Sequence, residues 1–430
     1  MSIQNAIEPG SDGIRMREMP TIFVIHPSPM LTDHLPHGDG LTAFGFIEQL
    51  ASRGYRLHVA VECVDVHRAL PENVTIYLLR PRLRVPVVSR LEYMLRVRLL
   101  YEKLRRTTKI DILHQLNPVV AGLSLALVGA PEPLVLGTYV ARWPRETDSV
   151  SLPWRLANNV ADRIRDAVCR LQQRRADAIL VTTPAALNTI PAARKLAPIV
   201  YSVPQGFCGE EFAPPADFSV SSIEDKPGSI LFLGGLWRRK GIFDLVKAFR
   251  LVTNAMPEVR LTIAGEGSDS NAIHASVARL PCSDRVHFAG RVSREALPEL
   301  LRQHNVCCVP SYGEGFGRAI IEAMGCARSI VATRAGAYPF IVDPQGGRLV
   351  PVADPESLAI ALIEVLASPE LQFQMGSYNR HKFERLYAWP AVMDSLECVY
   401  DRLIESRRLS PCSVVVNELP VETAKPTLTP

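Results

Sequence analysis

Short apolar runs alternate with longer helical patterns along this chain, and the alternation occurs twice. In the first half the runs at residues 21–25 and 56–61 predict strands, with a helix between them. The pattern restarts in the second half, where residues 229–233 and 260–264 predict strands on either side of another helix. Strands and helices in this order form parallel βαβ units. The sequence therefore predicts an α/β protein with two Rossmann-like parallel sheets in series.

The length of the chain also favours two domains. Its 430 residues exceed what one hydrophobic core usually serves, and the 47% that are hydrophobic can fill two cores. A weakly hydrophobic stretch, residues 213–228, follows the predicted change of domain. We therefore predict a first domain at residues 20–203 and a second at 204–386. The polar or proline-rich ends, residues 1–19 and 408–430, are predicted to be disordered tails.

Charge and cysteine content exclude several classes of protein. A net charge of +4 is too mild to predict a nucleic-acid partner. The nine cysteines are odd in number and show no CxxC spacing, which argues against disulfides and a cysteine zinc site and fits a reducing cytosol. The N-terminus lacks the apolar core of a signal peptide, and Pro131 and Pro133 interrupt the longest apolar region. We therefore expect a cytoplasmic location.

A glycine-rich turn follows the apolar run 306–309, which predicts a buried strand. The turn carries Glu314, and Glu322 follows eight residues later in a segment of helical pattern. Glycine lets the backbone approach a ligand closely, and the first amides of a helix favour phosphate or another anion. The turn therefore predicts an anion or sugar site that is framed by two carboxylates.

Three more loops of the second half follow predicted strands and carry polar groups. The first contains the cations Arg238, Arg239 and Lys240, the second contains Glu266, and the third begins at Gly290. Because the carboxyl ends of parallel strands meet along one edge of a sheet, we expect these loops to line one cleft. Cations and helix amides in that cleft would neutralise a diphosphate leaving group. Lys240 is the strongest candidate for the phosphate contact.

The order and spacing of these motifs resemble the nucleotide-sugar domain of family 4 glycosyltransferases, which have the GT-B fold. The motifs of the second half are Gly234-Gly235-Leu236 with Lys240-Gly241, Ala264-Gly265-Glu266-Gly267, Val286-His287-Phe288-Ala289-Gly290, Glu314-Gly315-Phe316-Gly317 with Glu322-Ala323-Met324, and Val331-Ala332-Thr333-Arg334-Ala335-Gly336. The first half carries weaker counterparts, His37-Gly38-Asp39-Gly40 and Val203-Pro204-Gln205-Gly206-Phe207. Tyr387-Ala388-Trp389-Pro390 resembles the terminal motif of the family, so the resemblance covers about residues 20–405. The resemblance implies that residues 387–407 form a helix that crosses back onto the first domain.

The resemblance implies a retaining glycosyltransferase that moves a sugar from a nucleotide-sugar donor to an acceptor hydroxyl of a polysaccharide, glycolipid or natural product. No metal or other cofactor is expected. By the same resemblance, Glu314 would contact the donor sugar, Lys240 would neutralise the diphosphate, and Glu322 would bind the ribose hydroxyls. The other implied donor-binding residues are Gly38, Gly40, Arg238, Arg239, Glu266, Gly315, Phe316 and Gly317.

The chain departs from the family pattern at two places. Many relatives have an arginine where this chain has Gly235, so Arg238 or Arg239 would supply the second cation. Relatives often carry a histidine at the end of a first-domain strand, where this chain has Tyr139. His114 ends the neighbouring predicted strand, resembles a histidine in a subset of relatives, and could face the acceptor as a catalytic group.

Other interpretations stay open. A non-catalytic scaffold that binds sugar nucleotides could keep the fold and lose the first-domain histidine, whereas an epimerase or phosphorylase is disfavoured because the glutamate spacing resembles transferases. Glu266 could simply cap or solvate a turn, and His26 and His114 could be hydrogen-bonded structural histidines. Acceptor choice is expected in the first-domain loops 34–39 and 139–148, and the donor base and sugar are not indicated.

Residues 80–109 carry ten cations and only two acidic groups, interleaved with apolar side chains. A basic amphipathic segment of this kind can lie on anionic lipid, which would bring the protein to the inner face of a membrane. The alternative is a helix whose apolar face packs on the sheet while its arginines are solvated. The sequence alone leaves both interpretations open.

Overall fold

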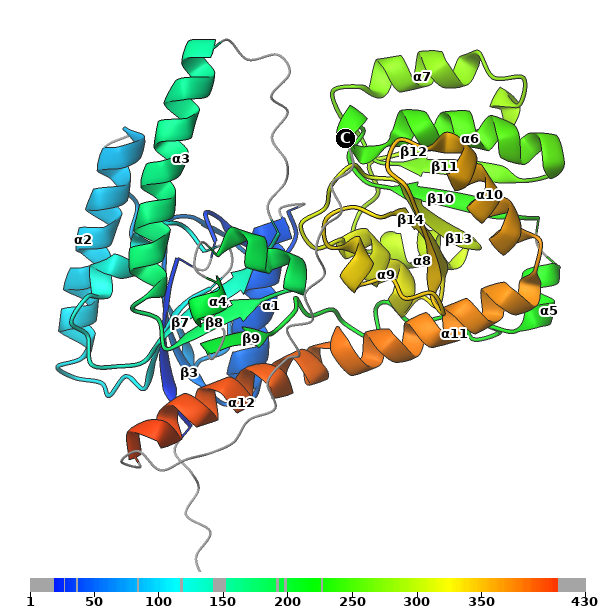
Figure 1. Ribbon diagram of the computed structural model, residues 1–430. Helices are drawn as coiled ribbons and strands as arrows, with labels where there is room; N and C mark the ends of the chain where they lie inside the picture. Colours follow the sequence, from blue (N-terminus) through cyan, green and yellow to red (C-terminus); the bar gives the residue numbers. More distant parts are fainter. Residues whose placement is uncertain are drawn as a thin grey trace, which may run out of the picture.

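The computed structural model describes residues 19–26, 28–35, 38–82, 85–116, 119–141, 152–190, 193–196, 199–225 and 227–408. Within these ranges the chain forms two parallel sheets with helices packed on them, one sheet from each half of the chain (Figure 1). Apart from Met19 and Arg408, the two predicted tails lie outside the described residues. His37 and most of the predicted acceptor loop 139–148 also lie outside them.

The first sheet has the strand order β5-β3-β1-β6-β7-β8-β9, and its strands pair in parallel. Its strands are β1 Thr21–Ile25, β3 Arg56–Val61, β5 Val74–Leu78, β6 Ile112–Gln115, β7 Leu134–Tyr139, β8 Ala178–Val181 and β9 Val200–Ser202. Its main helices are α1 Gly38–Ser52, α2 Pro86–Leu104 and α3 Leu152–Gln173, with a short α4 Ala193–Leu196.

The second sheet has the order β12-β11-β10-β13-β14-β15 and is also parallel. Its strands are β10 Ser229–Leu233, β11 Arg260–Ala264, β12 Val286–Gly290, β13 Val306–Val309, β14 Ser329–Thr333 and β15 Gly347–Val350. Its helices are α5 Val220–Glu224, α6 Ile242–Ala255, α7 Ser270–Ala278, α8 Leu297–Arg302, α9 Arg318–Gly325, α10 Pro355–Leu366 and α11 Pro369–Leu386. The strands predicted at residues 21–25, 56–61, 229–233, 260–264 and 306–309 are confirmed, and so are the helices predicted between the first two and between the next two.

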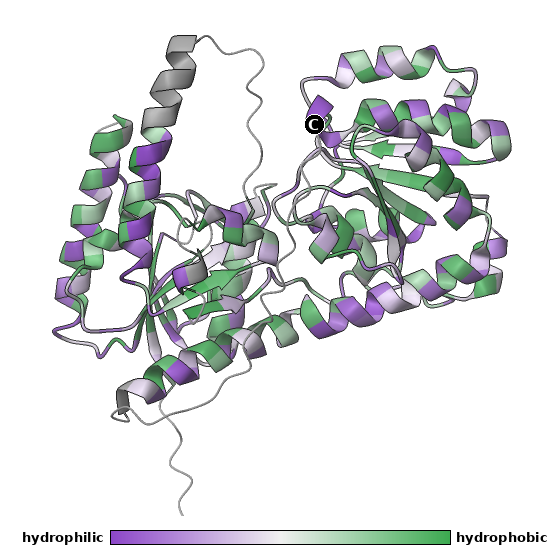
Figure 2. Cartoon of the chain, viewed as in Figure 1, coloured by the Kyte–Doolittle hydropathy of each residue, from purple (hydrophilic) through white to green (hydrophobic). Residues whose placement is uncertain are grey.

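Helices cover both faces of each sheet. Alternate side chains of a strand point to opposite faces, so side chains of both orientations are buried. In β1, Ile22 and Val24 pack with residues of α1, whereas Phe23 and Ile25 pack with residues of α2. The second sheet is covered in the same way, by α6 and α10 on one face and by α9 on the other. Figure 2 shows hydrophobic residues along the strands of both sheets. Burial on both faces explains why the strands read as nearly continuous apolar runs.

The second sheet has a topological switch point between β10 and β13. From β10 the chain proceeds through β11 to the edge strand β12, then returns to β13 and proceeds the other way to β15. Loops that follow adjacent strands at such a point diverge and leave a crevice at the carboxyl end of the sheet. The glycine-rich loops 234–241 and 310–317 follow β10 and β13, so both border this crevice.

The last helix, α12 Trp389–Arg408, belongs to the first domain's core although it follows the second domain in sequence. Its side chains Val392, Leu396 and Tyr400 are buried together with strand residues of the first sheet. Figure 1 shows α11 beside the second sheet and α12 continuing beneath the first. The predicted helix that crosses back onto the first domain is therefore confirmed.

The two chain crossings between the domains lie side by side. The amide of Phe207 donates to the carbonyl of Tyr387 at 2.9 Å, and the amide of Trp389 donates back to Phe207 at 3.0 Å. A side chain at Gly206 or at Gly45 of α1 would overlap the Trp389 indole. Both positions therefore require glycine where the domains join.

Within the described residues, no single helix is long and apolar enough to cross a bilayer. Helices α10 and α11 together meet the length and composition requirement, but they are bent by 97° relative to one another.

Candidate active site

Two glycine-rich loops of the second domain pack directly against each other at the switch point. The loop after β10 ends at Gly241, which has a positive φ of 69° and initiates α6. A Cβ at Gly241 would overlap the carbonyl oxygen of Pro310, the first residue after β13. The amide of Tyr312 also donates to the carbonyl of Arg239 at 2.8 Å. This close backbone approach brings the end of one loop beside the start of the other.

The approach places Lys240 beside Glu314. The Lys240 ammonium donates to Oε2 of Glu314 at 2.7 Å, and both side chains are mostly buried, with 15% and 14% exposed. The hydroxyl of Tyr338 donates to the same oxygen at 3.3 Å. The backbone around Glu314 is constrained as well, because Ala337 donates to its carbonyl at 3.0 Å and a Cβ at Gly336 would overlap that oxygen.

Helix α9 starts directly after this glutamate. Its N-cap is Gly317, whose φ of 85° is in the left-handed region and whose Cβ would lie 2.8 Å from the Tyr338 ring. The helix therefore begins with its first amides next to Glu314, in the arrangement that favours an anion. The carbonyl of Gly315 accepts a hydrogen bond from the amide of Ala141 in the first domain at 3.2 Å. The glycine turn thus touches both domains.

Glu322 is buried on α9, with 7% of the residue exposed. Burial raises the pKa of Glu322, and the positive charge of Arg318 opposes that rise. Arg318 donates to Oε1 of Glu322 at 3.2 Å, one helical turn away. The same guanidinium donates to Thr42 of α1 at 3.2 Å and lies 4.6 Å from the centre of the Phe207 ring. Arg318 therefore links the buried carboxylate to the first domain.

Arg318 is not among the residues that the sequence motifs indicate. Its spacing of four residues from Glu322 on a helix is the signal that could have identified it.

A cavity of about 200 Å³ lies between the domains, beside Arg318 at the start of α9. Arg318 and Arg294 line it from the second domain, and Thr42 and Phe44 of α1 line it from the first. Arg294 donates to Glu211, another lining residue, at 2.9 Å. The cavity walls therefore carry both charged and apolar groups from the two domains.

A family model for glycosyl transferases group 1 matches residues 215–382, which include both glycine-rich loops, Lys240, Glu314 and Glu322. Residues 215–382 form a group 1 glycosyltransferase domain. The predicted family is therefore confirmed for residues 215–382, which carry the most specific motifs.

Curated relatives match the group 1 domain and parts of its surroundings. The MMP α-(1→4)-mannosyltransferase of Mycolicibacterium hassiacum is 34% identical over 175 residues, which cover 40% of this chain and 42% of that protein. The mannosylfructose-phosphate synthase of Agrobacterium fabrum is 27% identical over 285 residues, which cover 63% of this chain and 60% of that protein. The chain thus spans about half the length of these relatives.

Solved structures resemble nearly the whole chain. Sucrose-phosphate synthase from Thermosynechococcus elongatus superposes with a TM-score of 0.67 and 22% identity, covering 90% of this chain and all of that chain. HepE of Anabaena in complex with UDP has a TM-score of 0.67 and 16% identity, covering 89% of this chain and all of its own. At these identities the likeness shows the fold alone. The predicted GT-B fold is confirmed.

Three other predicted donor-binding residues of the group 1 domain have side-chain contacts away from the Lys240–Glu314 pair. The Arg238 guanidinium lies 5.1 Å from the centre of the Phe243 ring, and that of Arg239 lies 4.9 Å from the Trp237 ring. Glu266 is half exposed and pairs with Arg291 at 3.1 Å, as a solvated loop carboxylate would. These contacts do not bring the three residues to Glu314.

The glycines of the first domain lie closer to the group 1 domain. Gly38 begins α1, and a Cβ there would be 3.9 Å from the Arg318 side chain. Gly40 is buried in the first turn of the same helix. Tyr139 is buried in the first-domain core, where the side-chain amide of Gln173 on α3 donates to its hydroxyl at 3.4 Å. The residue that touches the glycine turn near this point is Ala141.

His114 is not brought to the Lys240–Glu314 pair. Its side chain is fully buried, Nδ1 lies 2.6 Å from the hydroxyl of Tyr400 on α12, and Nε2 lies 3.2 Å from the carbonyl of Gly137. Both ring nitrogens therefore have partners inside the first domain. This environment supports the structural interpretation of His114 and does not support a contact with an acceptor.

The lowered pKa values of two buried histidines predict how the free energy of unfolding depends on pH. Burial lowers the pKa of His114 to about 3 and that of His26 to about 4, from 6.5. Between pH 6.5 and these values the unfolded chain binds more protons than the folded one, so stability should fall as the pH is lowered. Each ring should contribute up to about 1.4 kcal/mol per pH unit.

Urea titrations at several pH values test this dependence. The slope of the unfolding free energy against pH should be smaller for His114→Gln than for the unmodified protein. An equal slope in the two proteins would contradict the assignment to His114.

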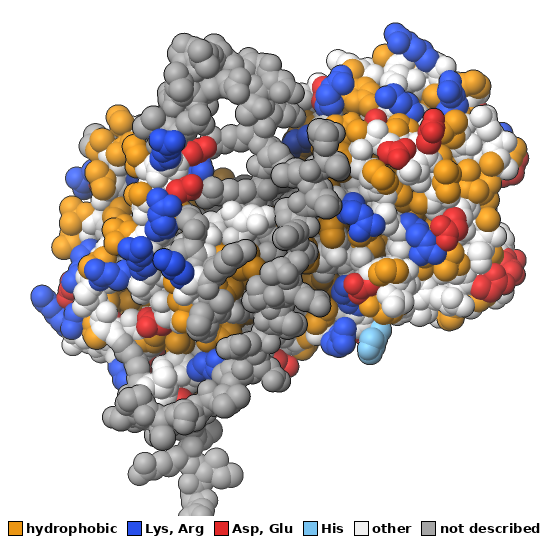
Figure 3. All heavy atoms as spheres, in the orientation of Figure 1, with side chains coloured by type: hydrophobic (Ala, Val, Ile, Leu, Met, Phe, Trp, Pro, Cys, Tyr) orange, Lys and Arg blue, Asp and Glu red, His pale blue; other side chains and the backbone are white. Residues whose placement is uncertain are grey.

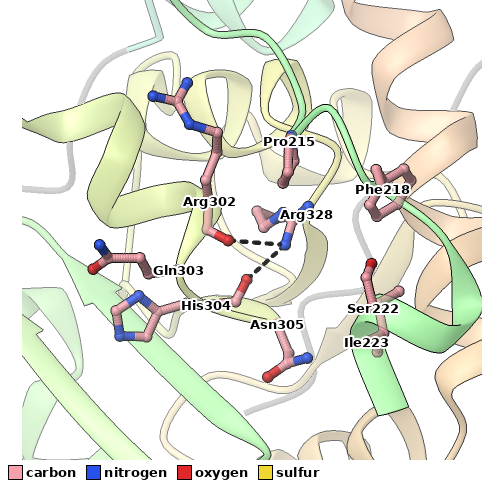
Figure 4. A pocket seen from close by; sticks show the side chains of 9 residues that line it. All are labelled: Pro215, Phe218, Ser222, Ile223, Arg302, Gln303, His304, Asn305 and Arg328. Atoms are coloured by element: carbon pink, nitrogen blue, oxygen red, sulfur yellow. Dashed lines mark hydrogen bonds between the residues drawn. The ribbon is translucent and has the colours of Figure 1, made fainter. Parts of the chain in front are cut away.

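A second, smaller cavity lies at the amino ends of the strands of the second sheet, near the start of β13 and β14 (Figure 4). Arg328 is buried there and donates to the carbonyl of His304 at 3.0 Å and to that of Arg302 at 3.5 Å. The cavity volume of about 10 Å³ matches a single water molecule. It is too small for a nucleotide, and it lies at the amino ends of the strands, away from the switch point.

Proposed function

We propose that the protein is a retaining glycosyltransferase that moves a hexose from a nucleotide-sugar donor to an acceptor hydroxyl without a metal ion. The observation that carries this proposal is the contact between Lys240 and Glu314 at the switch point of a group 1 domain. A movable cation, a fixed carboxylate and a helix N-terminus meet there. These are the groups that a sugar diphosphate needs for binding and for departure of its leaving group.

Lys240 would exchange its carboxylate partner for the donor's diphosphate. The exchange is feasible because Glu314 keeps the Tyr338 hydroxyl as a hydrogen-bond donor when the ammonium turns away. Glu314 could then accept hydrogen bonds from sugar hydroxyls. The amides of Gly315, Phe316 and Gly317 at the start of α9 would supply further positive potential. Glu322 would bind the ribose hydroxyls, with Arg318 compensating its charge.

In the transfer step the bond between the anomeric carbon and the diphosphate oxygen breaks, and the nucleoside diphosphate leaves with the electron pair. The acceptor oxygen then bonds to the anomeric carbon on the same face, and its proton passes to the departing phosphate. Lys240 and the amides would stabilise the growing negative charge, so no metal ion is required.

The relatives suggest which substrates to test first. Their names specify mannosyl transfer or phosphorylated products such as mannosylfructose phosphate, and one structural neighbour was crystallised with UDP-glucose. We therefore propose a hexose as the transferred group. A glycan or lipid-linked acceptor remains the proposed partner, in glycan biosynthesis.

A donor panel tests the proposed function. The purified protein should release nucleotide from at least one UDP-, GDP- or ADP-hexose when a cell extract supplies acceptor, and EDTA should not change the rate. Nuclear magnetic resonance of the product should show the anomeric configuration of the donor. Binding of a donor with no turnover would favour the non-catalytic scaffold, and an inverted product would contradict the retaining mechanism.

We also propose that α2 docks the protein on the anionic inner face of a membrane. The helix has two apolar faces: Tyr93, Val97 and Tyr101 pack into the first-domain core, while a second face is open to solvent. The open face carries Val88, Leu91, Leu95 and Leu99, which are 41%, 60%, 61% and 61% exposed. At 100° per residue these four side chains form a single stripe along the helix.

Cations border the stripe on both sides. Arg96 and Lys103 lie along one edge and Arg98 and Arg105 along the other, by the same helical geometry. Figure 3 shows Lys and Arg side chains beside hydrophobic ones on the first-domain side of the molecule. Salt bridges from Glu92 and Glu102 hold several of these arginines against the helix. An apolar stripe between cations suits the boundary between lipid headgroups and acyl chains.

Vesicle sedimentation tests the docking of α2. The protein should pellet with vesicles that contain phosphatidylglycerol and much less with neutral vesicles. Replacing Leu95 and Leu99 by serine should lower the partition coefficient at least about tenfold, because each loses apolar area that would enter the membrane. Ile360→Ser is the matched control, since Ile360 is 68% exposed on α10 of the other domain. Equal effects of the two variants would contradict the proposal.

A further inference from the structure

Two histidines and an aspartate converge beside the first sheet, and none of the three is assigned a part in the proposed bond-breaking step. The short strands β2 Leu31–Thr32 and β4 Val64–Asp65 pair in parallel there. His34 follows β2, Asp65 ends β4, and His67 follows two residues later. One potential ligand atom from each of these three side chains lies within 4.8 Å of the others.

Asp33 positions both histidines. Its side chain is 3% exposed and accepts hydrogen bonds from Nδ1 of His34 at 2.9 Å and from the backbone amides of His67 at 3.0 Å and Arg68 at 2.8 Å. The carboxylate therefore joins the segment after β2 to the segment after β4.

The contact with Asp33 determines which nitrogen of His34 is available. The Asp33 carboxylate oxygens already accept from two backbone amides, so Nδ1 of His34 acts as a further donor to this acceptor and carries the proton. In the neutral ring the lone pair is then on Nε2, which lies 3.9 Å from Oδ1 of Asp65. A lone pair and a carboxylate oxygen repel each other at close range unless a cation lies between them. A buried carboxylate that orients an imidazole in this way is typical of metal-binding histidines.

The second imidazole lies directly against the first. The rings of His34 and His67 are stacked, with centroids 3.6 Å apart and an angle of 10° between their planes. His34 is 28% exposed and Asp65 is 49% exposed, and His67 is also on the surface, so the three side chains have room to turn. Ligands around a tetrahedral zinc ion lie roughly 3.4 Å apart at bond lengths of about 2.1 Å. Rotation of the exposed side chains, which takes the two rings out of their parallel stack, would close the set around an ion.

We propose that His34, Asp65 and His67 bind a divalent transition-metal ion, with zinc the best match. Two imidazole nitrogens and one carboxylate oxygen, with an open side for water, form a donor set that zinc accepts readily. The ion would join the segments after β2 and β4. Because Asp33 and Arg68 also line the cavity between the domains, it would stiffen that wall. The site is separate from the transfer chemistry, which uses Lys240 and Glu314.

Zinc titration of the full chain tests this site. Protein stripped with EDTA should bind one equivalent of Zn²⁺ in competition with a chromophoric chelator, and Co²⁺ should give the visible spectrum of a tetrahedral or five-coordinate site. His34→Gln and His67→Gln should each lower the affinity at least about tenfold, because each removes a ligand. Asp33→Asn should lower it by about 10–100-fold without removing one.

His381→Gln, a change at an exposed histidine on α11, is the matched control and should bind zinc as the unmodified protein does. Circular dichroism and the Tm without metal check that each variant is folded, and zinc should raise the Tm only where the site is intact. If Asp33→Asn does not fold, the surface change Asp65→Asn replaces it as the third variant. Failure of the unmodified protein to bind zinc, or unchanged binding in the double variant of His34 and His67, would overturn the proposal.

Discussion

Replacing Lys240 by methionine should lower kcat and kcat/KM together by about 10²–10³-fold. The lysine ammonium is the cation at the switch point that contacts Glu314, and the proposed mechanism uses it most strongly when the diphosphate departs. Methionine keeps the length and apolar stem of the side chain but removes the charge. Steady-state kinetics with the active donor measure the effect.

Lys247→Met is the matched control for this change. Lys247 lies on α6 of the same domain, its side chain is 69% exposed, and its pairing with Asp244 is long, at 3.8 Å. Its rate constants should match those of the unmodified protein. Undiminished turnover in Lys240→Met, or an equal loss in Lys247→Met, would show that the proposed diphosphate contact is wrong.

Gly336→Ala should lower the free energy of unfolding by about 1–3 kcal/mol and lower kcat by roughly a further factor of 10². Gly336 has a positive φ of 55°, and its added Cβ would overlap the carbonyl oxygen of Glu314. The backbone must therefore shift, and the shift moves the Glu314 carboxylate that is proposed to bind the donor sugar. Denaturant unfolding measures the first effect and kinetics the second.

Gly290→Ala is the matched control, because it introduces the backbone strain of a positive φ without an overlap between the new Cβ and another atom. Gly290 also has a positive φ, 62°, but a Cβ there would have no atom within 4 Å. The substitution should cost only the strain of the left-handed conformation, about 1 kcal/mol, and should leave kcat unchanged. If both variants lose the same activity, the contact between Gly336 and Glu314 does not position the carboxylate.

The sequence predicted the parts of the structure that depend on short stretches of chain. Strand positions follow from apolar runs, and the loops after β10 and β13 follow from glycines at their ends. The closeness of Lys240 and Glu314 follows from a general rule, because loops after parallel strands meet at one edge of the sheet. The structure shows the same two residues in contact although they are 74 positions apart.

Contacts between the domains could not be predicted in this way. Arg318 reaches Thr42 across 276 positions, and His114 reaches Tyr400 across 286, so both depend on how the domains and α12 pack. His114 lies at the end of a strand as expected, yet α12 covers it. The cluster of His34, Asp65 and His67 also lacks a recognisable spacing, since a short strand pair brings its two segments together.

The most direct test of the account is a crystal structure of the protein soaked with the nucleoside diphosphate of its active donor. We expect that Lys240 leaves Glu314 and lies within salt-bridge distance of the diphosphate, and that the ribose hydroxyls donate to Glu322. A nucleotide bound elsewhere, with Lys240 still paired to Glu314 at 2.7 Å, would contradict the proposed site.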